Sequence, residues 1–380
     1  MKFRTAFENK TALTFAMKRL GWEPASEDGP WNFWWASVGI VRQLSDQTRL
    51  GDFQIINHFS NHIELTRKDL MFKNIKRYFR ENASQLNNRG DLKIWDCLPI
   101  TYSVPNDFAL FSEEFKRHPP GTIWIVKPTN RSQGKGIFLV NKLLHMNKWL
   151  REKNAEEDNN PFIVSKYVDK PLLIGGRKFD LRLYCLVLSY RPLVAYLHAQ
   201  GFARFCVLKY SMTAIDDEDL GAHLTNVAFQ KTEEDYNAVH GGKWTFANLW
   251  LYLQGSHGHT ATENLYNDIS FVLVQSLKAV VAAILNEKHS FELYGYDVLI
   301  DTALRPHLIE VNASPSLTVS TENDKFLKEE VLYDTLNLVA PPNFPEPTSM
   351  PYWEWRCRTD LHEAKKGGFT LISEPVVVGN

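Results

Sequence analysis

Three oxygen-bearing side chains in the last third of the chain have the types and the spacing of a metal site. Asp297, Glu310 and Asn312 lie in YGYDVLIDTALRPHLIEVNASPSL, residues 294–317. This stretch has the pattern of two short strands joined by a turn, and alternate residues of a strand point to the same face. Two carboxylates and an amide oxygen are hard ligands, of the kind that Mg²⁺ takes when nucleotide phosphates complete its shell. The pattern therefore predicts a Mg²⁺ site on one face of a hairpin.

The expected register of this hairpin brings the two acids together. If the turn is Thr302–Arg305, residue 301 pairs with residue 306, and Asp297 lies opposite Glu310. Opposed like charges destabilise a strand pair, and a cation between them reverses that effect. A three-residue loop would put the carboxylates out of step, and a surface turn with solvated acids would need no metal. We favour the metal because the other face is apolar. With this register the site face also carries Leu308, and the buried face carries Val298, Ile300, Ile309 and Val311.

Two further predicted strands carry charges that suit an anionic substrate. Lys127 ends the apolar run WIVKP, where a lysine either meets a phosphate as a point charge or simply reaches solvent. In KFDLRLYCLVL, Lys178, Asp180 and Arg182 alternate with apolar residues such as Phe179. An amphipathic edge strand has this pattern, and so does a catalytic face on which Arg182 clamps a carboxylate or a phosphoryl group.

Two short loops supply further groups for a nucleotide site. Gln133 and Gly134 lie in RSQGKG between two predicted strands, where small residues let backbone amides approach phosphate. The loop is neither a P-loop nor a Rossmann fingerprint. Thr225 and Asn226 end the run HLTN, which suits phosphate contacts and equally suits a helix cap or a turn.

The elements that must hold these residues indicate a mixed α/β protein. We expect strands at 123–127, 137–140, 162–168 and 178–188, a strand pair over 193–206, and helices at 246–253 and 267–285, followed by the hairpin. Residues 64–80 predict an amphipathic helix whose apolar side is Phe72, Ile75 and Phe79. Its basic stripe is Lys73, Lys76, Arg77 and Arg80. Such a stripe is a solvated face in most helices, and it gains a function only if the substrate is acidic.

Composition gives no sign of nucleic acid or membrane as a partner. The 380 residues are 44% hydrophobic and 23% charged with a net charge of −1, which is ordinary for a soluble globular chain. The most apolar long segment, 269–285, is interrupted by polar residues and predicts a buried helix, and the N-terminus predicts no signal peptide. The four cysteines form no C-x-x-C pair, which fits a reducing cytosol. They are Cys97, Cys185, Cys206 and Cys357.

A set of motifs in fixed order resembles the tubulin tyrosine ligase-like family, whose members are ATP-dependent carboxylate–amine ligases of the ATP-grasp type. The motifs are WIVKP, RSQGKGIFL, LLIGGRKFDLRLY, GFARF, HLTNVAFQK, GGKW, FELYGYDVLID and LIEVNASPSL. The resemblance spans roughly residues 22–338. The earlier segment INHFSNHIELTRKDLMFKNIKR resembles the glutamylase branch, and within it the ninth-member type first and the first-member type second.

The resemblance implies an α/β (α+β) architecture, with an ATP-grasp fold and an N-terminal mixed α/β domain. Residues 1–118 would form the N-terminal domain and dock the substrate through the basic helix. Residues 119–338 would form the ATP-grasp catalytic region. Residues 339–380 would be a flexible tail, because prolines recur there.

The resemblance also implies a role for each site residue. Lys127, Gln133 and Gly134 would contact the phosphates of ATP, Ser165, Lys166, Tyr167 and Val168 would line the adenine pocket, and Lys178, Phe179, Asp180, Thr225 and Asn226 would complete the nucleotide site. Asp297, Glu310 and Asn312 match the family's Mg²⁺ ligands. Arg204 and Lys243 would bind the incoming amino acid, and two cations suit the two carboxylates of glutamate. Lys73, Lys76 and Arg77 would dock the acidic tail of tubulin, and Lys178 and Arg182 would act in catalysis.

The implied reaction is the addition of free glutamate to glutamate side chains in the C-terminal tail of tubulin. ATP would activate the acceptor carboxylate as an acyl phosphate, and the amine of the incoming glutamate would then displace phosphate. A glycylase or tyrosine ligase on the same scaffold and a non-catalytic microtubule scaffold remain alternatives. Accessory subunits are plausible partners, and the resemblance implies cytoskeletal placement at a cilium, axoneme or basal body.

Overall fold

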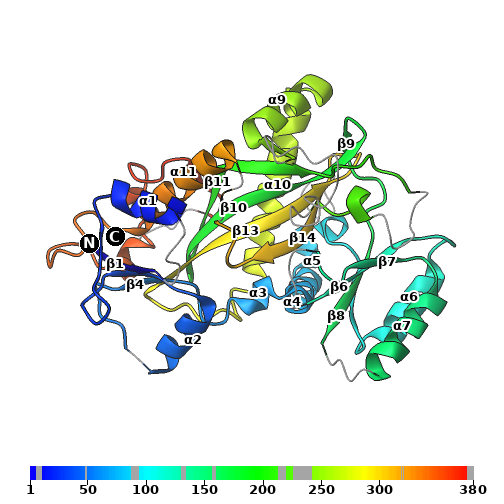
Figure 1. The fold of residues 1–380 in the computed structure, drawn as a ribbon, viewed down its shortest axis with the longest axis horizontal. Helices are drawn as coiled ribbons and strands as arrows, with labels where there is room; N and C mark the ends of the chain where they lie inside the picture. Colours follow the sequence, from blue (N-terminus) through cyan, green and yellow to red (C-terminus); the bar gives the residue numbers. More distant parts are fainter. Residues whose placement is uncertain are drawn as a thin grey trace.

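Two long strands form the centre of the larger of two β-sheets (Figure 1). β10 (Arg177–Tyr190) and β11 (Leu193–Phe205) pair antiparallel and consist largely of leucine, valine and aromatic residues, which favour extended backbone. β13 (Ser290–Ile300) pairs with β10 on its other side, and β14 (Pro306–Asn312) pairs with β13. The computed structural model describes residues 1–5, 11–47, 49–86, 94–129, 134–155, 160–212, 220–225, 242–317, 319 and 321–374.

The larger sheet continues into the N-terminal part of the chain. Its strand order is β12-β11-β10-β13-β4-β3-β1-β2, with β9 on β10 and β15 on β11. The N-terminal strands pair parallel with one another and with β13. They are β1 (Lys2–Thr5), β2 (Glu23–Pro24), β3 (Phe33–Trp35) and β4 (Ile55–Asn57), and the short outer strands are β9 (Leu173–Ile174), β12 (Lys243–Thr245) and β15 (Phe369–Leu371).

The second sheet has four strands and lies beside the first (Figure 1). Its order is β5-β8-β6-β7, and its strands are β5 (Thr101–Val104), β6 (Trp124–Pro128), β7 (Phe138–Val140) and β8 (Phe162–Lys166). Alternate residues of β6, Trp124 and Val126, are buried with Phe111 and Met146 of the helices α6 (Phe108–Arg117) and α7 (Leu143–Ala155). The intervening residues Ile125 and Lys127 point away from these helices, toward the larger sheet.

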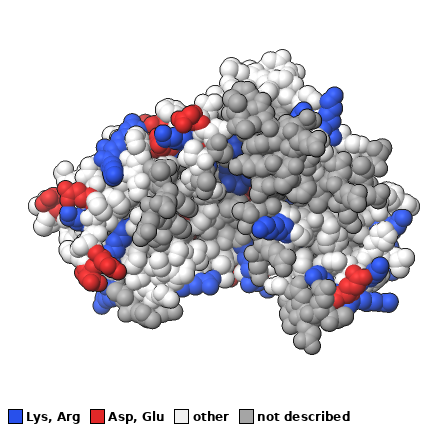
Figure 2. All heavy atoms as spheres, in the orientation of Figure 1, with Lys and Arg blue, Asp and Glu red and all other residues white. Residues whose placement is uncertain are grey.

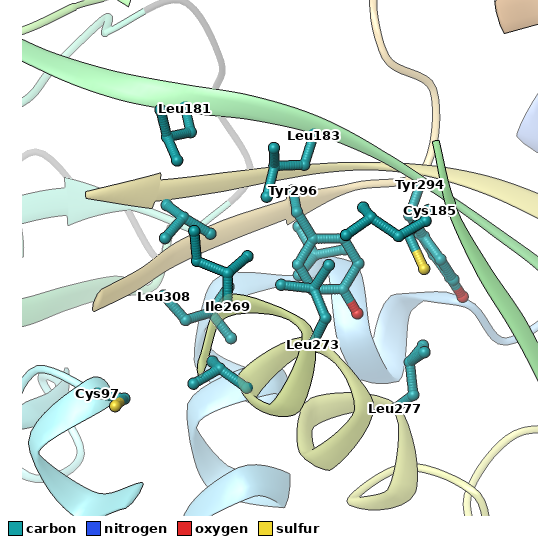
Figure 3. Packing of buried hydrophobic residues seen from close by; sticks show 14 of the residues in the cluster. Cys97, Leu181, Leu183, Cys185, Ile269, Leu273, Leu277, Tyr294, Tyr296 and Leu308 are labelled. Atoms are coloured by element: carbon teal, nitrogen blue, oxygen red, sulfur yellow. The ribbon is translucent and has the colours of Figure 1, made fainter. Parts of the chain in front are cut away.

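One face of the larger sheet is covered by helices. Figure 3 shows α10 (His259–Lys278) lying under β10, β13 and β14, with Ile269, Leu273 and Leu277 directed at the strands. Leu181, Leu183, Cys185, Tyr294, Tyr296 and Leu308 meet them from the sheet. Even the tyrosines are paired here, since the hydroxyl of Tyr296 lies 2.9 Å from Ser276 Oγ.

The opposite face of the same sheet has an apolar part and a charged part, which follow one another along the strands. Toward the end of β10, Tyr184, Leu186 and Leu188 pack with α11 (Glu322–Val339) and α1 (Thr11–Arg19) in a second buried cluster. Toward its start, the face carries Lys178, Asp180 and Arg182. The start of β10 therefore has charged residues on one face and core residues on the other, as the alternation in sequence predicted.

The remaining helices surround these layers. They are α2 (Val38–Gln47), α3 (Ile63–Thr66), α4 (Lys68–Glu81), α5 (Ala83–Leu86), α9 (Phe246–His257) and α12 (Tyr352–Trp355), with 3₁₀ turns at Ile94–Cys97, Leu220–Ala222 and Thr359–Leu361. The helices expected at 246–253 and 267–285 correspond to α9 and α10, with shifted ends. Among the described residues, no helix combines the length and the apolarity that crossing a bilayer requires.

The expected helix over 64–80 is two helices rather than one. Arg67 separates α3 from α4 with extended backbone, at φ −87° and ψ 121°. Phe72, Ile75 and Phe79 are buried as expected. Lys76 does not belong to the exposed stripe, because its ammonium donates to the carbonyl of Thr101 and lies 5.0 Å from the ring centre of Tyr102.

The expected domain boundary at 118 falls inside the second sheet. β5 and α6 both precede that residue, yet β5 pairs with β8 from Thr101↔Ser165 to Val104↔Phe162. The pairing joins segments some sixty residues apart, which local pattern does not reveal. The four-stranded sheet therefore begins near residue 101 rather than near 119.

The expectation of a flexible tail after 338 is wrong for the described residues. β15 pairs with β11, and Tyr352, Trp355 and Phe369 are buried at 0%, 1% and 1% exposure. The indole of Trp355 donates to the carbonyl of Leu338 at 2.8 Å. The prolines separate short packed elements instead of releasing the chain from the fold, so residues up to 374 are part of the body of the protein.

Candidate active site

A cavity lies between the two sheets, with α4 along one side. From the smaller sheet and its loops it is lined by Ile125, Lys127, Gly134, Ser165, Lys166, Tyr167 and Val168, and from the larger sheet by Lys178, Asp180, Arg204, Asp297, Leu299, Ile309 and Glu310. Thr225, His223, Lys68 and Phe72 complete the wall. Twelve residues that the sequence singled out separately thus line one cavity. They are Lys127, Gly134, Ser165, Lys166, Tyr167, Val168, Lys178, Asp180, Arg204, Thr225, Asp297 and Glu310.

A row of alternating charges crosses four strands on the floor of this cavity. Strand register sets the row, because Asp180 pairs with Arg204, Arg182 with Asp297, and Asp297 with Glu310. Arg204 donates to Asp180 at 2.8 and 2.5 Å and to Asp297 at 2.8 Å. Arg182 donates to the two oxygens of Asp297 at 2.6 and 3.1 Å. Asp297 is therefore held by two guanidinium groups while only 2% exposed.

The hairpin pairs its acids as expected, but through a different register near the turn. Near the turn, Ile300 pairs with Pro306 and Val298 with Leu308. The register shifts by one residue between Val298 and Asp297, and this shift places Asp297 opposite Glu310. The extra residue at this β-bulge is Ile309. Two face assignments from the sequence are therefore wrong. Leu308 lies in the core and Ile309 lines the cavity, whereas Val298, Ile300 and Val311 are buried as expected.

Glu310 is kept ionised by neighbouring lysines. Burial opposes its charge, but Lys68 and Lys127 outweigh burial and hold the pKa of Glu310 well below its usual value. Lys68 Nζ lies 3.0 Å from Glu310 Oε2. Sequence reasoning missed Lys68. The signal was present, since Lys68, Phe72 and Lys76 recur every four residues and share one side of α4, the side that meets the cavity and β5.

Two lysines face the middle of the cavity with weakened basicity. Burial lowers the pKa of Lys127 to about 8, although Glu310 partly opposes the shift. Burial likewise lowers the pKa of Lys178 to about 8. Lys178 Nζ donates to the hydroxyl of Tyr167 at 2.8 Å and to the carbonyl of His223 at 2.9 Å. The sequence reasoning named His223 only as part of the run HLTN and gave it no role of its own. Its ring contacts the Tyr167 hydroxyl at 3.0 Å.

The strand end expected to meet adenine lies at the cavity wall. Ser165 Oγ contacts Thr101 Oγ1 at 2.8 Å, and the amide of Tyr167 donates to the carbonyl of Ile123 at 3.0 Å. The glycine loop enters the cavity beside it. Gly134 and Gly136 have φ of 77° and 74°, the left-handed conformation that residues with a Cβ rarely adopt. Gln133 and Asn226 lie outside the described residues.

Several residues named from the sequence lie away from the cavity. Phe179 points into the hydrophobic core at 1% exposure, as its position between Lys178 and Asp180 on a strand requires. Lys243 lies in a neighbouring pocket, 3.3 Å from Asp324 of α11, although it pairs with Arg204 across β12 and β11. Lys73 and Arg77 are exposed on the outer side of α4.

The hairpin suits a hard divalent cation that shares its ligands with a phosphate. Asp297 and Glu310 are adjacent, and the amide nitrogen of Asn312 donates to Glu310 Oε1 and to the carbonyl of Gly295, both at 3.3 Å. Within the described part of the chain, no three His, Cys, Asp or Glu side chains come together in a way that could hold a metal ion. Two carboxylates, one amide and outside oxygens match the preference of Mg²⁺, which rarely uses all-protein cages.

Comparison with known proteins identifies the family of this chain. A family model described as "Tubulin-tyrosine ligase family" matches residues 44–348. The chain belongs to the tubulin-tyrosine ligase family. Its members are ATP-using ligases with an ATP-grasp-like fold, and membership confirms the mixed α/β class and the ligase class expected from the sequence.

Relatives within the tubulin-tyrosine ligase family match almost the whole chain. The chain is 44% identical over 369 positions to the probable alpha-tubulin polyglutamylase Ttll1 of Tetrahymena thermophila. This alignment covers 92% of this chain and 88% of that protein. It is 39% identical over 403 positions to the probable tubulin polyglutamylase TTLL9 of Bos taurus, with 98% and 83% covered. It is 40% identical over 337 positions to the probable tubulin polyglutamylase ttll-9 of Caenorhabditis elegans, with 89% and 79% covered.

Proposed function

We propose that this protein is a Mg²⁺- and ATP-dependent tubulin–glutamate ligase that adds glutamate to glutamate side chains in the acidic C-terminal tail of tubulin. The observation that carries the proposal is the cavity between the sheets. It brings two carboxylates, Asp297 and Glu310, into one space with the lysines 127 and 178, within a chain whose relatives are named tubulin polyglutamylases. The lysines suit the phosphates of a nucleotide and the carboxylates suit a cation, so a ligand that carries both fits this arrangement.

The reaction has two steps that need different help from the protein. The γ-carboxylate of the acceptor glutamate takes the terminal phosphoryl group of ATP, which releases ADP. The amine of free glutamate then attacks the acyl phosphate, and an amide forms while inorganic phosphate and a proton leave. Mg²⁺, when bound, neutralises charge on the transferring phosphoryl group. The protein itself must hold the anions close together and exclude water from the acyl phosphate.

We assign the phosphates to the side of the cavity that carries Lys127, Lys178 and the glycine loop. Each lysine offers a point charge, and Gly134 lets the backbone approach an anion. Thr225 adds a hydroxyl beside them. The wall from Ser165 to Val168 is the proposed adenine contact, through backbone groups at the end of β8. Gln133 and Asn226 keep their proposed phosphate contacts.

We assign the metal to Asp297, Glu310 and Asn312, and the incoming glutamate to Arg204 and Lys243. Arg204 lies at the cavity, and Lys243 is its pairing partner on the edge strand. The assignment requires the ammonium of Lys243 to exchange Asp324 for one of the two carboxylates of glutamate. Arg182 does not line the cavity. It donates to both carboxylate oxygens of Asp297, so we propose that it holds this metal ligand in place. We also propose that it stabilises negative charge in the tetrahedral intermediate.

We propose that the outer side of α4 guides the tubulin tail to the cavity. Lys73, Arg77 and Arg80 are exposed there, while the inner side of the same helix contributes Lys68 and Phe72 to the cavity wall. Figure 2 shows basic side chains around the hollow between the two sheets, whereas the acidic side chains of this view lie mainly toward the ends of the molecule. An acidic peptide would be attracted to that hollow over a Debye length, about 8 to 10 Å in physiological salt.

We further propose that the protein acts on microtubules of cilia, axonemes or basal bodies with the help of accessory subunits. The support is the resemblance of its motifs to the first- and ninth-member types, and relatives of both names are found. A fluorescently tagged chain is expected along axonemes or at their bases. Uniform distribution through ciliated cells would contradict this placement.

The test of the proposed function is transfer of labelled amino acids to microtubules with Mg²⁺ and ATP. Glutamate, glycine and tyrosine are offered in parallel, and a variant with Asp297→Ala and Glu310→Ala serves as the blank. The proposal predicts incorporation of glutamate alone, and none in the blank. Incorporation of glycine or tyrosine would identify a different ligase, and no incorporation with ATP still bound would favour a non-catalytic scaffold or a missing subunit.

A further inference from the structure

In the segment INHFSNHIELTRK, residues 56–68, only the last residue, Lys68, has a role in the site described so far, yet the rest of the segment is tied closely to the fold. The side chain of Asn57 exchanges hydrogen bonds with the backbone of Ala36 at 2.7 and 3.2 Å. Ser60 contacts Glu287, and Asn61 bonds to the backbone of Ala283 and Leu285. These contacts fix the chain on both sides of His58, so the position of this histidine is set by the fold and not by a free loop.

His58 has an unusual backbone and a fully buried partner. Its φ is 70°, in the left-handed region that non-glycine residues occupy rarely and that persists only where surrounding contacts enforce it. Its Nδ1 lies 2.5 Å from Oε1 of Glu292, and the amide of Phe59 donates to the other oxygen at 3.1 Å. Glu292 is 0% exposed and His58 is 3% exposed. A carboxylate at Nδ1 places a proton there and fixes the plane of the ring.

The other ring nitrogen of His58, Nε2, faces the chain just after the metal hairpin. His58 Nε2 lies 3.4 Å from Oγ of Ser314, two residues after Asn312. At the other end of the segment, Lys68 lies 3.0 Å from Glu310. The segment therefore holds the hairpin at residues 310 and 314, on either side of Asn312. The two contacts come from one continuous piece of chain, so they fix the spacing between the two points that they hold.

We propose that His58, oriented by Glu292, is a positioning residue of the ligase: it holds the chain that leaves β14, so that Glu310 and Asn312 keep the spacing that a shared cation requires. The inference rests on the proposed function, because it needs these residues to be metal ligands. His58 itself touches neither substrate nor metal in this assignment. Its effect passes through the hydroxyl of Ser314. Residues that orient metal ligands in this way typically change metal affinity or activity by about 10- to 100-fold.

The proposal is tested with His58→Gly, Ser314→Ala and the double variant. Glycine accepts a φ of 70° without strain, so His58→Gly removes the ring and leaves the backbone path allowed. Ser314 is exposed, so Ser314→Ala removes the contact with little risk to folding. The readouts are Mn²⁺ affinity in the presence of a non-hydrolysable ATP analogue, measured by electron paramagnetic resonance, and the Mg²⁺ dependence of glutamate transfer. His362→Ala is the matched control, since His362 is also buried, with Tyr196 and Trp355 as its partners.

The expected result is a loss of Mn²⁺ affinity of about 10- to 100-fold in His58→Gly, with a parallel rise in the Mg²⁺ concentration needed for transfer. Ser314→Ala shifts both in the same direction, and the double variant is no worse than His58→Gly, because both changes break one contact. The control lowers the unfolding temperature without moving either readout. Unchanged Mn²⁺ affinity in folded Ser314→Ala and His58→Gly would overturn the inference. A wild-type protein that transfers no glutamate but binds Mn²⁺ would instead count against the proposed function.

Discussion

The two halves of β10 present the same face to very different surroundings. Toward its start, Lys178, Asp180 and Arg182 point into a cavity or into its charged floor. Toward its end, the same face carries Leu186 and Leu188 beneath α11 and α1, both at 0% exposure. One continuous strand thus supplies both reactive groups and core.

The comparison also separates what stabilises the protein from what makes it active. Burying a leucine removes apolar surface from water, a gain of about 1.5 to 3 kcal/mol for each side chain. Burying ion pairs such as Arg182–Asp297 gains little, because the cost of removing both charges from water offsets their attraction. The charged half therefore adds little to stability, and its residues are explained by function. Substitutions in the charged half should mainly lower glutamate transfer per folded molecule. Substitutions in the apolar half should mainly lower the free energy of unfolding.

The largest effect on activity is expected for Glu310→Gln. The substitution keeps the size of the side chain but removes a metal ligand and the partner of Lys68, so glutamate transfer should fall on the order of 10²- to 10³-fold. The free energy of unfolding should also fall, because Lys68 and Lys127 lose their partner, so transfer is compared per folded molecule. Asp301→Asn is the control, because Asp301 lies on the same hairpin but bonds to His307 and to the turn. Equal loss of transfer in the control would mean that the hairpin, and not its ligand, had been disturbed.

The next effect is a dependence of ATP binding on pH. Lys127 and Lys178 have pKa values lowered to about 8, so each is charged below that pH and neutral above it. Because phosphate binds the charged form, ATP affinity should fall as pH rises past 8, by up to about tenfold per pH unit for each lysine. Calorimetry between pH 7 and pH 9.5 measures this slope.

Variants of Lys127 and Lys178 test whether these two lysines cause the fall of ATP affinity with pH. Lys127→Met should weaken ATP binding at pH 7 and reduce the slope to that of one lysine, and Lys127→Met with Lys178→Met should remove it. A slope that is unchanged in the double variant would show that other groups titrate, and the phosphate assignment of the two lysines would be wrong.

A smaller effect is expected on the outer side of α4. Changing Lys73, Arg77 and Arg80 to Glu should lower transfer to microtubules about tenfold at low salt, and less at high salt, because the attraction is screened. ATP affinity should not change. The control reverses two other exposed cations, Lys116 and Arg117 on α6. If ATP affinity falls in parallel, or the control loses as much activity, α4 does not dock the tail.

The smallest effect on activity belongs to the apolar half. Leu186→Ala should lower the free energy of unfolding by about 2 to 5 kcal/mol, because the side chain is completely buried. The folded fraction should transfer glutamate at the rate of the wild type, since no residue of the cavity is changed. A loss of transfer per folded molecule that approached that of Glu310→Gln would break the separation between the two halves.

Strand alternation is a local property, so the sequence alone predicted which charged residues of β10 share a face. Lys178, Asp180 and Arg182 had to share a face once the strand was recognised. The two acids of the hairpin lie on different strands, so their pairing depends on the register, which includes a bulge. The bulge at Ile309 was not predictable, because packing of Leu308 into the core selects it. The inward position of the Lys76 side chain also could not be predicted, because it depends on a partner farther along the chain, the carbonyl of Thr101.

Long-range pairing limited the rest of the prediction. Nothing local in TYSV indicates that β5 pairs with β8, so the boundary at 118 was misplaced. The prolines after residue 340 masked the burial of Trp355 and Phe369, whose partners lie on α11 and β11. His58 was part of a recognised motif, but its contact with Ser314 joins segments 256 residues apart. In each case the deciding neighbour is far away in sequence.

The most direct test is tandem mass spectrometry of tubulin tail peptides after incubation with the protein, Mg²⁺, ATP and glutamate. The account predicts glutamates joined by amide bonds to the side chain of an internal glutamate, and none when Glu310→Gln replaces the wild type. Addition at the C-terminal carboxylate, or the same modification with Glu310→Gln, would contradict the claim that the cavity between the two sheets is a tubulin–glutamate ligase site.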